Sequence, residues 1–298
     1  MTESGMNEKR KPGDGRKEQG MLYLCATPIG NLEDMTYRAV RMLREADLIA
    51  AEDTRNTIRL LNHFDIHTPM TSYHEYNKYD KARELAAAIQ EGKTVVLVTD
   101  AGMPGISDPG EELVRICLDE GIRVSVVPGA CACVSALAIS GLPARRFCFE
   151  AFLPQQKKER QAVLEALQSE TRTIVIYEAP HRLKKTLAQL YEALGERRIS
   201  VCRELTKVHE EVLELRLSEA VGYYEAHEPR GEFVLVIEGC EEEQIRRSQQ
   251  RAWEDMPLAD HMQRYLSEGM DRKAAMKAVA KDRGVSRREI YDQVVEKK

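Results

Sequence analysis

Residues 96–110 read VLVTDAGMPGISDPG, and this stretch decides how the chain is expected to fold. An apolar run stops at Asp100 and becomes a loop of small residues and prolines, which a helical segment at 111–120 follows. In an open α/β sheet, ligands bind at the carboxyl ends of the strands. Gly102 and Gly105 allow the backbone to approach a ligand closely. The stretch predicts a strand, a loop and a helix, in which the loop is either a ligand site or only a turn.

Composition limits the class of protein. The 298 residues are enough for two domains, and 43% hydrophobic with 31% charged residues is typical of a soluble, cytoplasmic protein. No apolar run is long enough to span a bilayer, so we expect no membrane contact. The net charge of −5 argues against broad, charge-driven nucleic-acid binding but permits a local basic surface. Residues 1–20 are polar, lack the apolar core of a secretory signal and are predicted to be a disordered tail.

The metal and disulfide chemistry of the chain is predicted to be simple. Its 7 cysteines are scattered and form no Cys-x-x-Cys pair, which favours reduced thiols in a cytosolic protein. Its 7 histidines form no cluster with spacing suited to zinc. We therefore expect no metal site.

The hydrophobic pattern divides the chain into two α/β halves and a tail. Strands and helices alternate over 21–135, which predicts a mostly parallel sheet. A second α/β half is expected over 136–240. The short spacing between its strands at 212–217 and 232–237 predicts that these two pair antiparallel, giving a mixed sheet.

The remaining residues, 241–298, read as a charged linker and a small helical module. Asp271 can cap one helix, Gly284 can end it, and Ser286 with Glu289 forms a capping box for the last helix. Two helices joined by a short turn resemble a helix-turn-helix. Over residues 271–298, Lys and Arg outnumber Asp and Glu by nine to five, so the module is expected to contact either RNA or another protein.

Four ordered segments resemble the tetrapyrrole methylase superfamily, which uses S-adenosylmethionine (SAM). They are TPIGN at 27–31, the loop that begins at Asp100, VPGA at 127–130 and GEFVLVIEG at 231–239. Further segments resemble its ribosomal RNA small subunit methyltransferase I branch: AEDTR at 51–55, SDPG at 107–110, GLP at 141–143, YEAPHR at 177–182 and RELTK at 203–207.

The resemblance implies two α/β domains with a SAM-binding cleft between them, in a homodimer. It also implies methyl transfer to the ribose 2′-oxygen of a cytidine in the decoding region of 16S ribosomal RNA, within the small ribosomal subunit. One departure bears on the substrate: tetrapyrrole-modifying members commonly follow the loop aspartate with proline, whereas Ala101 follows Asp100 here. Met103 and Gly105 also differ from the residues typical of the ribosomal branch.

The same segments supply the candidate site residues. The predicted cofactor-binding residues are Pro28, Asp100, Ala101, Gly102, Met103, Ile106, Ala130, Cys131, Ala132, Tyr177, Glu178, Gly231 and Glu232. A base can assist proton loss from the 2′-hydroxyl, and the candidates are Glu178, Glu204 and Lys207. For Glu178 the alternative is an ion pair with Arg182.

Arginine and histidine side chains near these segments are candidates for contact with RNA phosphate. They are Arg55, His181, Arg182 and Arg203, each of which could instead be an ordinary surface or interdomain charge. Arg160, with Lys157 and Lys158, is expected to form a solvated helix start that could extend a basic path. Two other functions stay open, namely methylation of a tetrapyrrole and a non-catalytic ribosome-assembly factor that binds RNA.

Overall fold

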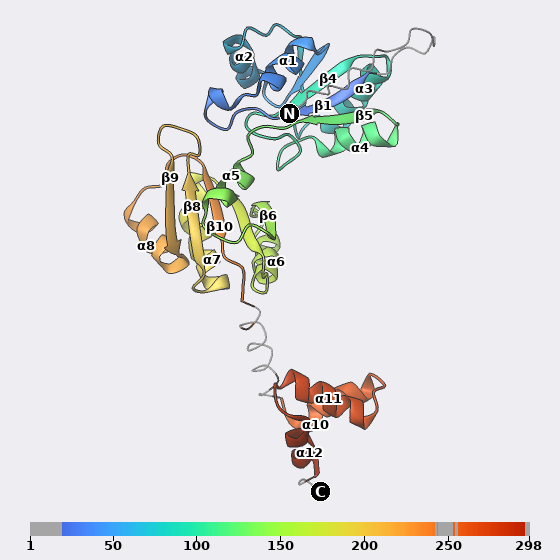
Figure 1. Cartoon of the computed structure of the whole chain (residues 1–298), viewed down its shortest axis with the longest axis vertical. Coiled ribbons are helices and arrows are strands. Elements are labelled where there is room, and N and C mark those ends of the chain that lie inside the picture. The colour runs from blue at the N-terminus through green and yellow to red at the C-terminus, as the bar shows by residue number, and fades with distance from the viewer. Residues whose placement is uncertain (1–19, 242, 244–252, 254–255, 296–298) are drawn as a thin grey trace, which may run out of the picture.

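The computed structural model describes residues 20–241, 243, 253 and 256–295, and Figure 1 shows two α/β domains and a C-terminal helical region. The predicted tail at 1–20 lies outside the described residues except for Gly20, as does most of the predicted linker at 241–254. No helix in the described ranges is long and apolar enough to cross a membrane.

The first domain is built on a five-stranded sheet in the order β3-β2-β4-β1-β5, in which every pairing is parallel. Its strands are β1 (Met21–Cys25), β2 (Leu48–Ala51), β3 (Met70–Ser72), β4 (Thr94–Val98) and β5 (Arg123–Val127). Its helices are η1 (Leu32–Asp34), α1 (Tyr37–Glu45), α2 (Thr54–His63), α3 (Lys78–Gln90) and α4 (Glu111–Asp119). The predicted parallel sheet is confirmed.

Alternating side chains of the central strand β4 pack into two cores. Val95 and Leu97 join the core that α3 and α4 cover, whereas Val96 and Val98 join the core under α1 and α2. Successive side chains of a strand point to opposite faces, so an apolar strand can bury both. This explains why β4 reads as a continuous apolar run.

The loops after β1 and β4 meet at one edge of this sheet. The chain leaves β1 through α1 on one face and leaves β4 through α4 on the other. The loops are joined by two backbone hydrogen bonds, from Thr27 N–H to Gly102 O at 2.9 Å and from Gly102 N–H to Thr27 O at 3.1 Å. Divergence of this kind opens a crevice at the carboxyl ends of the strands.

The second domain has a mixed five-stranded sheet in the order β6-β7-β10-β8-β9. Its strands are β6 (Phe147–Phe152), β7 (Thr173–Glu178), β8 (Arg198–Arg203), β9 (Glu211–Arg216) and β10 (Phe233–Ile237). Its helices are α5 (Ala132–Ile139), α6 (Lys157–Leu167), α7 (Pro180–Leu194) and α8 (Leu217–Ala226). The mixed sheet is confirmed, but the predicted pairing of the last two strands is wrong. Strands β9 and β10 each pair antiparallel with β8 instead, on its two opposite sides. Helix α8 connects β9 to β10 and takes the chain from one side of β8 to the other.

Helix α5 packs on the second sheet. Its Cys133, Ala136 and Leu137 share a core with Val175 of β7 and Val234 of β10. The predicted domain boundary between residues 135 and 136 runs through this helix. The core also includes Ile29 from the loop after β1, so the two domains are in direct contact.

The C-terminal region contains α10 (Leu258–Ser267), α11 (Arg272–Asp282) and α12 (Arg287–Val295), which share a small core of their own. The Asp271 side chain caps α11 by accepting from Ala274 N–H at 2.7 Å. Ser286 accepts from Glu289 N–H at 3.3 Å, as the capping box requires. The two predicted helices are confirmed, and α10 adds a third that contacts α11.

Candidate functional site

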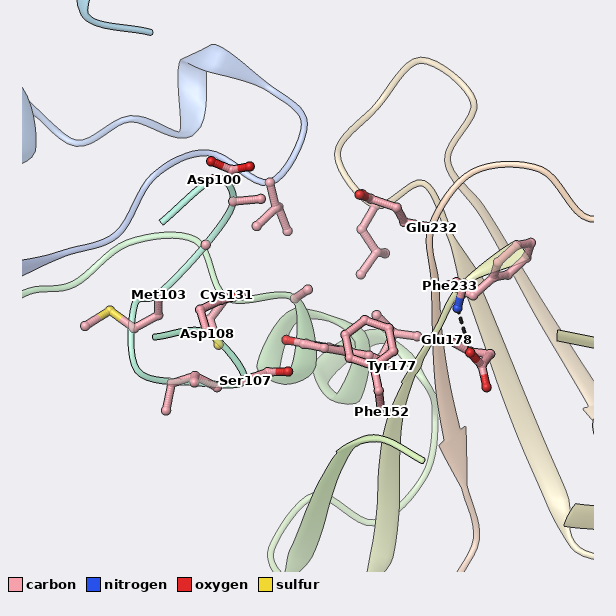
Figure 2. Close-up of a pocket in the computed structure, with 18 of the residues that line it drawn as sticks. Asp100, Met103, Ser107, Asp108, Cys131, Phe152, Tyr177, Glu178, Glu232 and Phe233 are labelled. Atoms are coloured by element: carbon pink, nitrogen blue, oxygen red, sulfur yellow. Dashed lines mark hydrogen bonds between the residues drawn. The ribbon is translucent and has the colours of Figure 1, made fainter. Parts of the chain in front are cut away.

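A cavity of about 470 Å³ lies between the two α/β domains, and we refer to it as the interdomain cavity. Its walls are the loop after β4, the start of α5 and the ends of β6, β7 and β10 (Figure 2). Its lining is Ile29, Glu52, Asp100, Ala101, Gly102, Met103, Ile106, Ser107, Asp108, Cys131, Ala132, Phe152, Tyr177, Glu178, Ala179, Pro180, Leu205, Glu232, Phe233 and Val234. Most of the predicted cofactor-binding residues therefore meet at one cavity.

Three of the predicted cofactor-binding residues do not line the cavity. Pro28, Ala130 and Gly231 each immediately precede a residue that does. Their predicted contact with a cofactor is left untested.

Asp100 fixes the loop after β4 against the start of α2. One carboxylate oxygen accepts from Asp53 N–H at 3.2 Å, and the other accepts from the Asn56 side-chain amide at 2.9 Å. Glu52 holds the same strand end, because it accepts from the Thr99 hydroxyl and from Asp100 N–H. The acidic side chains at this edge therefore position the cavity wall.

Gly102 brings this wall close to the loop after β1 and to the segment before α5. Its φ is +84°, and a Cβ there would lie 3.3 Å from Ile29 Cγ2 and 3.7 Å from Ala130 O. A left-handed backbone conformation strains any residue with a side chain. Glycine thus lets the loop turn without crowding Ile29, which also lines the cavity.

Aromatic side chains of the second domain form the opposite wall. The Tyr177 ring makes edge contacts with Phe149 and Phe152, with centroid distances of 4.9 and 5.7 Å. The Tyr177 hydroxyl accepts from Cys133 N–H at 3.0 Å, which satisfies a backbone donor in the first turn of α5. This wall is therefore largely apolar and is held together by ring contacts and a hydrogen bond.

Cys131 and Cys133 stand at this end of α5, with their sulfur atoms 3.5 Å apart. All 7 cysteines lie within the described residues, and none of them forms a disulfide. The described ranges hold no group of three or more His, Cys, Asp or Glu side chains that could bind a metal ion.

The charge of the interdomain cavity is acidic. Its lining includes the carboxylates of Glu52, Asp100, Asp108 and Glu232 but no lysine, arginine or histidine. Such a lining attracts cations and repels anions. The cavity therefore suits a cationic ligand with an apolar portion.

Glu178 lies at the end of β7, but its carboxylate points away from the loop that carries Asp108 (Figure 2). Its side chain is fully buried. One oxygen accepts from Ala179 N–H at 2.8 Å and lies 3.3 Å from Arg182 Nε, while the other accepts from the Thr186 hydroxyl. The geometry favours the ion-pair alternative, and a catalytic role for Glu178 stays an untested prediction.

Glu178→Ala is therefore expected to destabilise the protein. Removing one partner of a buried ion pair leaves the other charge uncompensated, at a cost of about 3 kcal/mol. Thermal unfolding measures this loss directly. Glu178→Gln keeps acceptor capacity and is expected to retain most of the methyl transfer activity; loss of activity in a normally folded Glu178→Gln would restore Glu178 as a catalytic candidate.

Glu204 and Lys207 form a charged cluster with Glu232 at the edge of the cavity. Lys207 Nζ lies 2.8 Å from Glu204 Oε1 and 2.9 Å from Glu232 Oε2. Burial is the largest single effect and opposes ionisation of both Glu204 and Lys207. Their mutual hydrogen bond, the hydrogen bonds with Glu232 and the opposite charges nearby together outweigh it, so the pKa of Glu204 is lowered and the pKa of Lys207 is raised. Both groups stay charged at neutral pH, which makes Lys207 a poor base. Their predicted roles as bases remain untested.

Asp108, like Glu52, is a cavity carboxyl that sequence reasoning missed. Burial and the nearby charge of Glu52 raise its pKa to about 6. Within the described residues no cation pairs with Asp108, in contrast to Glu178 and Glu232. The SDPG segment at 107–110 contains Asp108, but this segment served only to support the family resemblance, and its carboxyl was given no chemical role. A carboxyl with a pKa near neutrality can accept a proton.

The four predicted phosphate-binding residues do not form one group. His181 and Arg182 line a second cavity of about 270 Å³ on the second domain. Arg55 lies 2.6 Å from Asp53 at the start of α2, and Arg203 Nε lies 3.1 Å from Glu211 Oε2. The structure thus brings together only the pair at the start of α7.

Comparison with known proteins identifies the family. The model for the Tetrapyrrole (Corrin/Porphyrin) Methylases matches residues 21–221. The chain belongs to this family. It is therefore a methyltransferase, and its methyl donor is SAM.

Close relatives of this tetrapyrrole methylase family member carry one name. A protein of Halalkalibacterium halodurans named Ribosomal RNA small subunit methyltransferase I is 50% identical over 277 residues, which cover 93% of this chain and 95% of the relative. A protein of Thermotoga maritima with that name is 47% identical over 222 residues, which cover 74% of this chain and 100% of the relative.

A solved structure shows the same fold. Uroporphyrin-III C-methyltransferase from Thermus thermophilus, complexed with S-adenyl homocysteine, superimposes with a TM-score of 0.51 and 22% identity. The match covers 73% of this chain and 97% of that one. The two-domain architecture is thus that of a tetrapyrrole methylase.

The interdomain cavity fits SAM. SAM carries a positively charged sulfonium, which matches the acidic lining. Its adenine needs a flat apolar surface, which Tyr177 and Phe152 can provide. The loop at Gly102 lets backbone groups reach the ligand without an intervening side chain. Binding of SAM in this cavity therefore agrees with the residues that line it.

Proposed function

We propose that this protein methylates a ribose 2′-oxygen in small-subunit ribosomal RNA, at a cytidine in the decoding region of 16S rRNA. The observation that carries the proposal is the 50% identity, over 93% of the chain, to a relative named for ribosomal RNA methylation. The departure of Ala101 from the proline of tetrapyrrole-modifying members agrees with it. Because ribosomal RNA is a cytoplasmic substrate, we also propose that the protein is cytoplasmic.

The acidic lining of the interdomain cavity also separates this function from methylation of a tetrapyrrole. Porphyrin and corrin precursors carry several carboxylates, which the carboxylates of Glu52, Asp100 and Asp108 would repel. The RNA backbone would instead find positive charge at the second cavity, which His181 and Arg182 help to line. A cationic cofactor and an anionic substrate would thus occupy neighbouring regions of opposite charge.

The chemistry needs alignment more than activation. SAM supplies a methyl group that is already activated, and the chain must hold the ribose oxygen in line with the bond that breaks. The loop at 100–108 and the aromatic wall at Tyr177 would hold the cofactor and exclude water. Asp108, whose pKa is raised to about 6, would accept the proton of the 2′-hydroxyl as the new bond forms.

We also propose that the protein is a homodimer, as its resemblance to the family implies. Val134 and Ile139 on α5 are about half exposed, at 53% and 46%, and could supply apolar contact to a second copy. Light scattering combined with gel filtration gives the mass in solution. A mass of one chain would reject the dimer.

The acceptor is tested by supplying labelled SAM with three alternatives: assembled small ribosomal subunits, naked 16S rRNA and a uroporphyrin-type precursor. We expect label in RNA, with assembled subunits as the better acceptor. Label in the macrocycle would replace the proposal with tetrapyrrole methylation. SAM binding without transfer to any acceptor would favour a non-catalytic assembly factor.

Removing residues 242–298 is expected to leave the α/β domains folded and able to bind SAM. The C-terminal helices have a separate core, and the T. maritima relative is matched over its whole length by 74% of this chain. Calorimetry of SAM binding and thermal unfolding of the shortened chain measure both properties. A tenfold loss of SAM affinity would show that the C-terminal region supports the interdomain cavity.

A further inference from the structure

The second cavity lies between the segment after β6 and the first turns of α7. It is lined by Gln155, Arg160, His181, Arg182, Lys185, Thr186 and Gln189. Every one of these side chains can donate a hydrogen bond, and no carboxylate is among them. We refer to it as the basic cavity.

Arg160 is the anchor of the basic cavity. It is only 9% exposed, in contrast to the predicted solvated helix start, whereas Lys157 and Lys158 beside it are exposed as expected. Its Nη1 donates to the carbonyls of Pro154 and Gln155 at 3.1 and 3.0 Å, which fixes the guanidinium in the wall. Within the described residues it forms no ion pair. A buried charge without a counter-charge is costly, so this site favours an anion.

The first turns of α7 provide the other charges. His181, Lys185 and Gln189 are spaced four residues apart and therefore follow one face of the helix. Arg182 donates to Leu153 O at 2.6 Å and pairs with the buried Glu178, whose carboxylate balances its positive charge. Arg160 and Lys185 remain uncompensated. The N-terminal end of a helix adds positive potential.

The basic cavity adjoins the interdomain cavity. Ala179 and Pro180 line the interdomain cavity, and the next two residues of the chain line the basic one. Glu178 joins the two sites, because its carboxylate accepts from Thr186 of the basic cavity. An anion held at Arg160 would thus lie in a cavity whose wall is continuous, through residues 178–182, with the wall of the interdomain cavity.

We propose that the basic cavity binds a backbone phosphate of the RNA substrate and so positions the ribose that is methylated. The inference rests on the proposed function, since it supplies the RNA. A guanidinium and an ammonium around one pocket match a phosphodiester, because arginine contacts two oxygens at once and lysine adds a point charge. The phosphate held there belongs to a nucleotide close to the target.

The test compares neutralising variants of two adjacent lysines. Lys185→Gln removes a charge from the basic cavity. Lys184→Gln removes the same charge one residue away, where the side chain pairs with the exposed Glu228 at 2.9 Å. The readouts are KM for assembled small ribosomal subunits at several monovalent salt concentrations, kcat, and the Kd for SAM. Arg160→Gln is the third variant, and its thermal unfolding is measured first.

We expect Lys185→Gln to raise the KM for subunits at least threefold. We also expect it to reduce the slope of log KM against log salt concentration by about one, the value for one lost phosphate contact. Arg160→Gln is expected to raise KM by about tenfold or more. The Kd for SAM should stay unchanged in each variant, and Lys184→Gln should behave as the unmodified protein. Inorganic phosphate should inhibit the unmodified protein competitively with subunits and inhibit Lys185→Gln less.

Two results would overturn the proposal in distinguishable ways. If the unmodified protein methylates RNA but Lys185→Gln keeps its KM and salt dependence, the basic cavity does not bind RNA phosphate. If the unmodified protein transfers methyl to no RNA, the proposed function itself fails, and this inference fails with it. If Arg160→Gln does not fold, the comparison of KM and salt dependence between Lys185→Gln and Lys184→Gln still tests the proposal.

Discussion

Asp108→Asn is expected to lower kcat for methyl transfer by about a hundredfold to a thousandfold, the usual loss when a general base is removed. The Asn side chain has nearly the same shape but cannot accept the proton of the ribose hydroxyl. The Kd for SAM is expected to change little, because Glu52 and Asp100 keep the cavity acidic. Single-turnover measurements isolate the chemical step from product release.

The pH dependence of the same step follows from the raised pKa of Asp108. The carboxyl is protonated below its pKa of about 6 and cannot then act as a base. The rate should therefore rise about tenfold per pH unit up to that point and level off above it. Asp108→Asn should lose this rise. Asp119→Asn on the exposed end of α4 is the control and should keep it. An unchanged pH profile in Asp108→Asn would show that another group accepts the proton.

Gly102→Ala is expected to weaken SAM binding by about tenfold or more. The new Cβ would lie 3.3 Å from Ile29 Cγ2 at a φ of +84°, so the loop must shift or strain. Either response moves the cavity wall that Gly102 and Met103 form. Calorimetric titration with SAM measures the change.

Gly121→Ala is the control that separates the effect of backbone strain from the effect of moving the cavity wall. Gly121 also has a positive φ, of +70°, but its Cβ would meet nothing within 4 Å and it lies in the turn before β5. Both variants should lose about 1 kcal/mol of stability to backbone strain, and Gly102→Ala should lose more because its Cβ also crowds Ile29. Only Gly102→Ala should lose SAM affinity. Equal SAM affinity in the two variants would contradict the assignment of the cofactor to this wall.

The part of the fold nearest the site could be predicted from the sequence. The run at 96–98 and its Gly/Pro loop predicted β4, the cavity wall and α4, because an apolar strand ends abruptly at a carboxylate and a loop of small residues. Most predicted cofactor-binding residues also line the interdomain cavity. They come from the segments that resemble the tetrapyrrole methylase superfamily, and those segments lie at the ends of strands in the two sheets.

Other features depend on packing that a linear pattern does not contain. Strand β6 shows no clear alternation of apolar and polar residues, so the sequence pattern does not predict it. The sequence also does not reveal that α8 takes the chain across β8, so that β9 and β10 do not pair with each other. Tyr177 and Glu178 were both expected to face the cleft, yet consecutive side chains of a strand point to opposite faces. The burial of Arg160 and the raised pKa of Asp108 likewise arise from neighbours distant in the chain.

The most direct test of the central claim is mass spectrometry of nucleosides from 16S rRNA. Small ribosomal subunits that lack the modification are incubated with the protein and with SAM that carries a deuterated methyl group, and the RNA is digested. We predict one labelled nucleoside, a cytidine with the label on its ribose. Label on a base, on another nucleoside or on no RNA at all, with SAM bound, would contradict the account.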